Sequence, residues 1–196
     1  MDVDVRPLRD DERAAAGGVA GRALSTSPTS FWVYGDEPVT RVRASLDLFV
    51  GFVSGQSEPL GALMGEHVVG ICGFAPPGAC IGALAPENLR TPPATVGGTG
   101  DPSRGQYIWA LYCGRDLDER HWHLGPVAVE PGLQGAGIGG LMLRAFGEQM
   151  DADGEVAWLE TDKPENVVFY RRAGFDVTDE VTEHGLTTWW MRRDPR

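Results

Sequence analysis

Residues Gln134 to Gly140 read Gln-Gly-Ala-Gly-Ile-Gly-Gly and join an apolar stretch to an amphipathic one. Glycines carry no Cβ, so consecutive backbone N–H groups can turn toward one point. The helix that follows adds the partial positive charge of its N-terminus. The stretch therefore predicts an anion-binding loop between a strand and a helix, of the kind that holds a phosphate or a pyrophosphate.

The same glycines also match the dinucleotide fingerprint G-x-G-x-x-G, and Glu160 lies 20 residues after Gly140, where a ribose-binding acid is expected. In that fingerprint the first glycine directly closes the strand. Here residues 130–133 separate the loop from Val129, the last residue of the expected strand. A P-loop is excluded because no Lys-Ser/Thr pair follows the glycines. A nucleotide-dependent oxidoreductase stays an alternative, although the chain shows no second mononucleotide-binding half.

The segments on either side of the loop carry a second signature. The segment 121–129 precedes it, and Asn166 and Tyr170 stand four residues apart before Gly174-Phe175. This combination resembles the GNAT (GCN5-related) N-acetyltransferases, whose pyrophosphate loop reads Gln/Arg-x-x-Gly-x-Gly/Ala and whose second motif is such an Asn/Tyr pair before Gly-Phe. The runs 169–178 and 188–191 look closest to the puromycin N-acetyltransferase branch. The resemblance is specific over residues 120–193 and only architectural over 1–75, and no family motif matches 76–119.

The resemblance implies an α/β fold with a mixed, mostly antiparallel central sheet of about seven strands and about four or five flanking helices. A chain of 196 residues with 42% hydrophobic content can bury one sizeable core. We therefore expect a single domain over residues 1–196, with 76–119 as an insertion that forms a lid or specificity element. No apolar run approaches the roughly 20 residues of a membrane span, and the acidic N-terminus does not resemble a signal peptide. We expect a cytoplasmic protein.

Hydrophobic periodicity and turn residues predict the elements. We expect strands over 3–8, 59–64, 67–75, 121–129, 156–160, 175–181 and 186–192, and helices from residue 9 to about 24 and over 40–53, 106–113, 137–150 and 166–173. Residues 25–37 read as a loop, and residues 91–105 as the flexible middle of the insertion. Gly174 is expected to close the helix before it.

Charge and cysteine content limit the partners. The net charge of −11 repels nucleic acid and attracts cationic small molecules such as amines, and it also keeps a protein soluble. Cys72, Cys80 and Cys113 are too few and too irregularly spaced for a disulfide framework or a zinc site. The expected partners are a small-molecule amine and, because exposed final strands of this fold often pair, a second copy in a homodimer. No nucleic acid or membrane is expected.

The resemblance implies acetyl-CoA (coenzyme A) as cofactor. Its pantetheine arm would lie along the strand 121–129 like an added strand. Gly125-Pro126 would help to expose that edge, because proline donates no hydrogen bond to a ladder and the pair favours a bulge. The expected cofactor-binding residues are Val127, Ala128, Val129, Gln134, Gly135, Ala136, Gly137, Ile138, Gly139, Gly140, Asn166 and Tyr170.

Acetyl transfer to an amine also needs a base and an acid. His123 is the candidate base, because a neutral imidazole can take a proton from an ammonium directly or through water. It also stands six residues before Val129, where arylalkylamine N-acetyltransferase carries a catalytic histidine. By resemblance Tyr170 protonates the departing thiolate. Glu160 either orients the substrate ammonium or caps a turn.

The acceptor would be contacted by Phe31, Trp32 and Tyr34 of the aromatic loop, and by His121, which shares the face of His123. A metal held by the two histidines is the rival interpretation, but the sequence offers no third ligand in view. Each of these side chains could also serve packing alone.

The sequence thus predicts an N-acetyltransferase acting on the primary amine of a small molecule, such as an antibiotic or another amine metabolite. A protein that binds acyl-CoA as a sensor or sequestering partner, without turnover, is the alternative from a different class.

Overall fold

The computed structural model describes residues 2–56, 58–79 and 90–196. Its strands are β1 (Asp4–Pro7), β2 (Leu60–Met64), β3 (His67–Ala75), β4 (His121–Val129), β5 (Val156–Thr161), β6 (Asp176–Glu183) and β7 (Leu186–Arg193). Its α-helices are α1 (Arg13–Leu24), α2 (Pro28–Tyr34), α3 (Pro38–Ser54), α6 (Pro102–Cys113), α7 (Ile138–Asp153) and α8 (Pro164–Arg172). Short 3₁₀ turns, Asp10–Glu12 and Pro131–Leu133, precede α1 and the glycine loop.

All seven strands form one sheet in the order β1-β2-β3-β4-β5-β7-β6. Every neighbouring pair is antiparallel except β4 and β5. The predicted fold class is therefore confirmed, with six helices in the described residues rather than four or five. The oxidoreductase alternative is contradicted, because a dinucleotide-binding fold needs a mostly parallel sheet.

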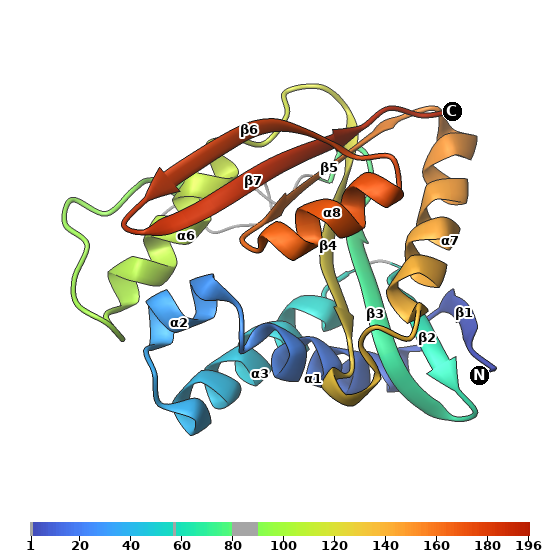
Figure 1. Ribbon diagram of the computed structural model, residues 1–196, viewed down its shortest axis with the longest axis horizontal. Helices are drawn as coiled ribbons and strands as arrows, with labels where there is room; N and C mark the ends of the chain where they lie inside the picture. Colours follow the sequence, from blue (N-terminus) through green and yellow to red (C-terminus); the bar gives the residue numbers. More distant parts are fainter. Residues whose placement is uncertain (1, 57, 80–89) are drawn as a thin grey trace.

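Helices cover both faces of the sheet (Figure 1). On one face α7 packs through Met142 and Phe146 over strands β2 to β4, and α8 covers β5. On the other face α1 packs through Val19 and Ala20 onto β3 and β4, with α3 behind it. Neighbouring residues of β2 and β3 point to opposite cores, as the period of a strand requires: Ala62 and Cys72 belong to one core, Leu63 and Ile71 to the other.

Helices α1 and α3 approach closely because α1 carries glycine at the contact. A Cβ on Gly17 would lie 2.5 Å from the Cα of Val50, and a Cβ on Gly21 would lie 2.8 Å from the Cα of Leu46. Both neighbours are backbone atoms, which cannot move aside as a flexible side chain does. The glycines therefore set how near α3 lies to α1.

Strands β4 and β5 diverge halfway along their length (Figure 1). They pair only from His121 to His123 with Val156 to Trp158. Beyond this point β4 continues beside β3 with a register shift at Gly125-Pro126, as the sequence predicted, and the Gln56 amide donates a 2.8 Å hydrogen bond to the Gly125 carbonyl. The side of residues 124–129 that faces β5 has no strand partner within the described chain.

Two predictions of secondary structure are wrong: one helix was missed, and another begins earlier than expected. Residues 25–37 are not a loop, since Pro28–Tyr34 form α2, capped by the Ser27 side chain on the Ser30 N–H. Helix α6 begins at Pro102 rather than at residue 106, and the Asp101 side chain caps it. In both cases a capping residue followed by proline at the first helical position was the signal.

Part of the expected insertion, residues 80–89, lies outside the described residues. No described helix is both long enough and apolar enough to span a bilayer.

Candidate active site

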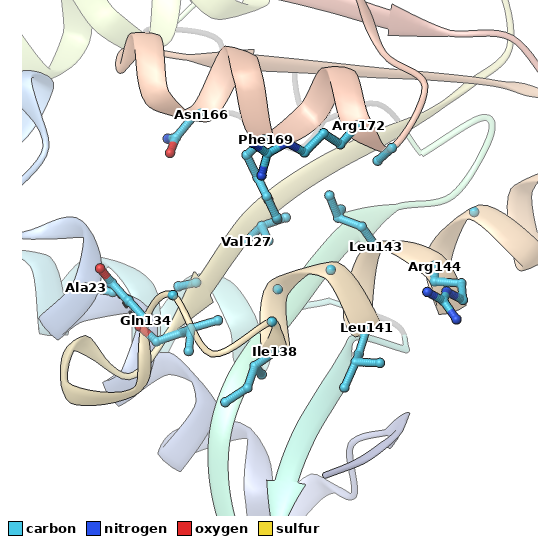
Figure 2. A pocket seen from close by; sticks show the side chains of 18 of the residues that line it. Ala23, Val127, Gln134, Ile138, Leu141, Leu143, Arg144, Asn166, Phe169 and Arg172 are labelled. Atoms are coloured by element: carbon cyan, nitrogen blue, oxygen red, sulfur yellow. Dashed lines mark hydrogen bonds between the residues drawn. The ribbon is translucent and has the colours of Figure 1, made fainter. Parts of the chain in front are cut away.

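A cleft of about 830 Å³ opens where β4 and β5 diverge. Figure 2 shows it bounded by β4 at Val127, by the glycine loop and α7, and by α8 with Asn166 and Phe169. We call it the loop cleft. Of the twelve residues predicted to bind the cofactor, ten line it, and the exceptions are Ala136 and Tyr170.

The glycine loop has the geometry that its sequence predicts. Gly135 and Gly137 have φ of +80° and +86°, a backbone conformation that residues with a Cβ rarely adopt. A Cβ on Gly139 would come within 2.9 Å of the Phe169 ring, so this glycine allows α8 to lie against α7. No side chain caps the N-terminus of α7. Its first backbone N–H groups are therefore available to an anion in the cleft.

Cationic side chains gather around the loop cleft although the chain is acidic overall. Arg144 from α7 and Arg172 from α8 both line it, and Figure 2 shows them beyond the glycine loop. Lys163, Arg193 and Arg196 complete the set. Arg193 is held by Asp151 at 2.7 Å. Sequence analysis missed these cations, because they are far apart in the chain and stand outside the family motifs.

A second cavity, of about 250 Å³, adjoins the loop cleft. Helices α2, α3 and α6, part of β4 and the end of β5 enclose it, and we call it the inner cavity. Leu24, Val127 and Asn166 line both spaces. Its charged lining residues within the described chain are Glu160 and Asp162. The two spaces thus meet beside a strand edge, with two acids on the inner side and, on the outer side, five cations that outnumber the acids Glu148 and Asp151.

His123 lies behind Glu160 rather than in the inner cavity. Its side chain is 3% exposed, with Nε2 2.9 Å from Glu160 Oε2 and Nδ1 3.1 Å from Asp116 Oδ1. Burial lowers the pKa of His123, but the Glu160 charge and the hydrogen bonds to Asp116 and Glu160 outweigh it and raise the pKa to about 9. An imidazolium that donates from both nitrogens fits this arrangement. Glu160 lines the inner cavity and His123 does not, so His123 reaches the cavity only through Glu160.

Asp116 completes this cluster from the loop after α6. Burial raises the pKa of Asp116, but its contacts with His121 and His123 outweigh that and hold the pKa well below the usual range. His121 is also buried, with Nδ1 2.7 Å from the Glu119 carbonyl oxygen. Its Nε2 also lies 2.9 Å from Asp116 Oδ1, but without the geometry of a hydrogen bond. The prediction that His121 meets the acceptor therefore finds no support, since the side chain does not line the inner cavity.

Asp116, His121 and His123 offer donor atoms within 4.8 Å of one another. Asp116 is thus the third potential metal ligand that sequence analysis did not find, because it lies outside the strand that carries both histidines. The contacts of His123 have the length of ordinary N–H···O hydrogen bonds. We therefore describe the group as a hydrogen-bonded cluster.

Tyr170 and Asn166 project from one face of α8, as their spacing predicts. Tyr170 is buried and lines the inner cavity. Burial, followed by the neighbouring ionisable groups, among them the Glu160 and Asp162 carboxylates, raises its pKa, so the phenol is protonated at neutral pH. The Asn166 amide donates a 3.0 Å hydrogen bond to the Thr161 hydroxyl, which fixes the side chain where the two spaces meet.

The aromatic residues of α2 do not all reach the inner cavity. Tyr34 lines it, whereas Phe31 and Trp32 do not. The Arg41 guanidinium lies 3.7 Å from the Phe31 ring centroid, and Trp32 stacks on His184. The expectation that all three side chains contact the acceptor therefore finds support in the cavity lining for Tyr34 but not for Phe31 or Trp32.

A family model described as an acetyltransferase (GNAT) domain matches residues 103–177, which run from α6 through β4, the glycine loop, α7, β5 and α8. The fold is similar to that of a Corynebacterium glutamicum protein described as histone acetyltransferase HPA2 and related acetyltransferase, with TM-score 0.68, 18% identity and coverage of 100% of this chain and 98% of that one.

Two further structures extend the comparison. PaiA N-acetyltransferase from Thermoplasma acidophilum, solved in complex with coenzyme A, has TM-score 0.61, 14% identity and 99% coverage of both chains. Drosophila melanogaster polyamine N-acetyltransferase, which forms N-acetylagmatine, has TM-score 0.70 and 13% identity over 98% of this chain and 100% of that one. None of these comparisons singles out the puromycin branch, which stays a prediction. Residues 103–177 therefore match a GNAT acetyltransferase domain, and the chain shares its fold with these acetyltransferases.

Proposed function

We propose that the chain transfers the acetyl group of acetyl-CoA to the primary amine of a small molecule. The observation that carries the proposal is the junction at Val127 and Asn166. There a cleft with an uncapped helix N-terminus and several cations meets a cavity lined by two carboxylates. An anionic donor and a cationic acceptor can approach this point from opposite sides.

The loop cleft suits the donor. The N–H groups of the glycine loop and of the first turn of α7 would hold the pyrophosphate, with Ala136 among them, and Arg144 and Arg172 would neutralise its charge. The open edge of Val127–Val129 would pair with the amides of the pantetheine arm. Bound in this way, the donor supplies an acetyl thioester, whose carbonyl carbon is the electrophile.

Glu160 and His123 form the base in this proposal. A primary amine arrives protonated, and only its neutral form attacks. The Glu160 carboxylate, at the cavity wall, receives the ammonium and takes its proton. His123 orients Glu160 through the 2.9 Å contact, and Asp116 holds His123 in turn. His123 thus acts through Glu160 rather than on the amine itself.

Tyr170 is the proposed acid. As the amine nitrogen bonds to the acetyl carbon, the C–S bond breaks, and its electron pair goes to sulfur. The Tyr170 phenol gives its proton to that thiolate, so that coenzyme A leaves as a thiol. Because the raised pKa keeps the phenol protonated at neutral pH, Tyr170 is ready to donate. Water can then take the second proton from the new amide nitrogen and return a proton to the tyrosine.

Release of free thiol from acetyl-CoA in the presence of a panel of primary amines tests the proposal. Glu160→Gln should lower kcat/KM by roughly 10²–10⁴-fold, the range for a lost general base. Glu165→Gln, an exposed change on α8 outside both spaces, is the matched control and should leave the rate unchanged. Tight binding of acetyl-CoA with no turnover on any amine would instead favour the non-catalytic acyl-CoA-binding protein.

A further inference from the structure

The inner cavity is chemically divided, and the division bears on which amine it accepts. This inference rests on the proposed function. Its acidic end consists of Glu160 and Asp162 at the end of β5, next to the junction with the loop cleft. The Thr29 N–H donates a 2.8 Å hydrogen bond to Asp162, whereas Glu160 is held from behind by His123. Both acids line the cavity beside the junction, where the proposed function places the reacting nitrogen.

Most of the rest of the cavity wall is apolar, although Ser27, Thr29, Ser30 and Ser45 also line it. Its larger apolar and aromatic side chains come from three helices and include Tyr34, Phe49, Phe52, Ile108, Trp109 and Tyr112. The rings of Phe52 and Trp109 lie 6.2 Å apart, centroid to centroid. Away from the end of β5, the described lining contains no further acid, and it contains no arginine, lysine or histidine. A second cation on the acceptor would therefore find no counter-charge among these rings.

The volume limits the acceptor as well. An apolar cavity of about 150 Å³ holds one benzene molecule. The inner cavity, at about 250 Å³, has room for one ring together with a short arm that carries the amine. Burying an unpaired charge is costly, whereas burying a ring-sized apolar group is favourable.

We infer that the acceptor is a primary monoamine whose body is apolar and about the size of one aromatic ring. The ammonium lies at Glu160 and Asp162, and the body packs against Phe52 and Trp109. Amines with more than one positive charge, such as agmatine and spermidine, fit poorly, because their further charges would lie against the aromatic wall. The acceptor class thus differs from that of the polyamine N-acetyltransferase with a similar fold.

The thiol-release assay with phenethylamine, hexylamine, agmatine and spermidine tests this inference. We expect kcat/KM for the two monoamines to exceed that for the two polycations by about 10-fold or more. Equal or better turnover of agmatine or spermidine would overturn the inference and leave the proposed function standing. If none of these amines is acetylated, and no other amine is, the proposed function fails and the inference fails with it.

Variants locate the effect. Trp109→Leu should lower kcat/KM for phenethylamine by about 10–100-fold, while the KM for acetyl-CoA stays unchanged. Tyr107→Leu is the matched control, because Tyr107 lies on the same helix but packs on His184, outside the cavity. Should Trp109→Leu not fold, Phe52→Leu removes the neighbouring ring and serves the same purpose. Unchanged phenethylamine kinetics in the folded variant would contradict the inference.

Discussion

His123 should make the stability of the protein depend on pH, and the size of the effect follows from its contacts. Asp116 and Glu160 face its two nitrogens, and His121 is the other titratable group beside it. Its pKa rises from 6.5 to about 9 on folding. A difference of roughly 2.5 units corresponds to about 3 kcal/mol.

The sign follows from the direction of the shift. Because the folded state binds the proton more tightly than the unfolded state, the stabilisation is fully present below about pH 6.5 and is lost as pH rises through about 9. The contribution of His123 should therefore be about 3 kcal/mol near pH 6, about 2 kcal/mol near pH 7.5 and close to zero near pH 10. Other groups also titrate in this range, so the comparison needs a variant that lacks only this proton.

Urea unfolding of the wild type and of His123→Gln, followed by tryptophan fluorescence, provides the measurement. The chain has six tryptophans as probes. The difference in unfolding free energy between the two proteins should shrink by about 3 kcal/mol between pH 6 and pH 10. A difference that stays constant across this range would refute the reasoning, since it would mean that folding does not raise the pKa of His123.

Four further outcomes are expected. Tyr170→Phe should lower kcat by roughly 10–10³-fold with little change in the KM for acetyl-CoA, and wild-type turnover would reject its role as the acid. Gly137→Asp should abolish detectable acetyl-CoA binding in calorimetry, because it places a side chain and a negative charge at a φ of +86° in the loop. Gly17→Ala should destabilise the protein by about 1–3 kcal/mol through its clash with α3, whereas Gly18→Ala, which meets only the end of a flexible arginine, should be neutral or stabilising by up to about 1 kcal/mol. Treatment with a chelator should leave the rate unchanged, and a loss of activity restored by zinc would show that the histidine cluster holds a metal.

The parts of the fold that follow from local pattern were predictable from the sequence. The strand 121–129 was predicted with the bounds that the structure gives, because an apolar run and a glycine loop delimit it. The positive φ of Gly174 fits its predicted place at the end of α8. Helix α2 was missed because its seven residues are mostly aromatic, β-branched or polar, so composition favoured a loop over the capping signal at Ser27 and Pro28.

The site was only partly predictable, for a different reason. Motifs identified the loop, Asn166 and Tyr170, since each stands at a fixed distance from the others in the chain. The inner cavity is built from helices that are far apart in sequence, so residues such as Trp109 carry no local signal. Asp116 likewise lies outside the strand that it contacts. Glu160 faces the cavity and His123 lies behind it because of the way in which β4 and β5 diverge and twist. The pattern of amino acids along the chain does not encode that twist.

The divergence of β4 and β5 has a consequence for the energetics of the whole molecule. The sheet consists of two half-sheets, β1 to β4 and β5 to β7, whose seam carries only three paired positions. A donor lying along the open edge of β4 would add backbone hydrogen bonds that the seam lacks. Ligand that binds only the folded protein stabilises it by RT ln(1 + [L]/Kd), about 2.7 kcal/mol at 100 times Kd. Occupancy of the cleft should therefore slow hydrogen exchange of the β4 amides. The free energy of donor binding would then also help to hold the two half-sheets together.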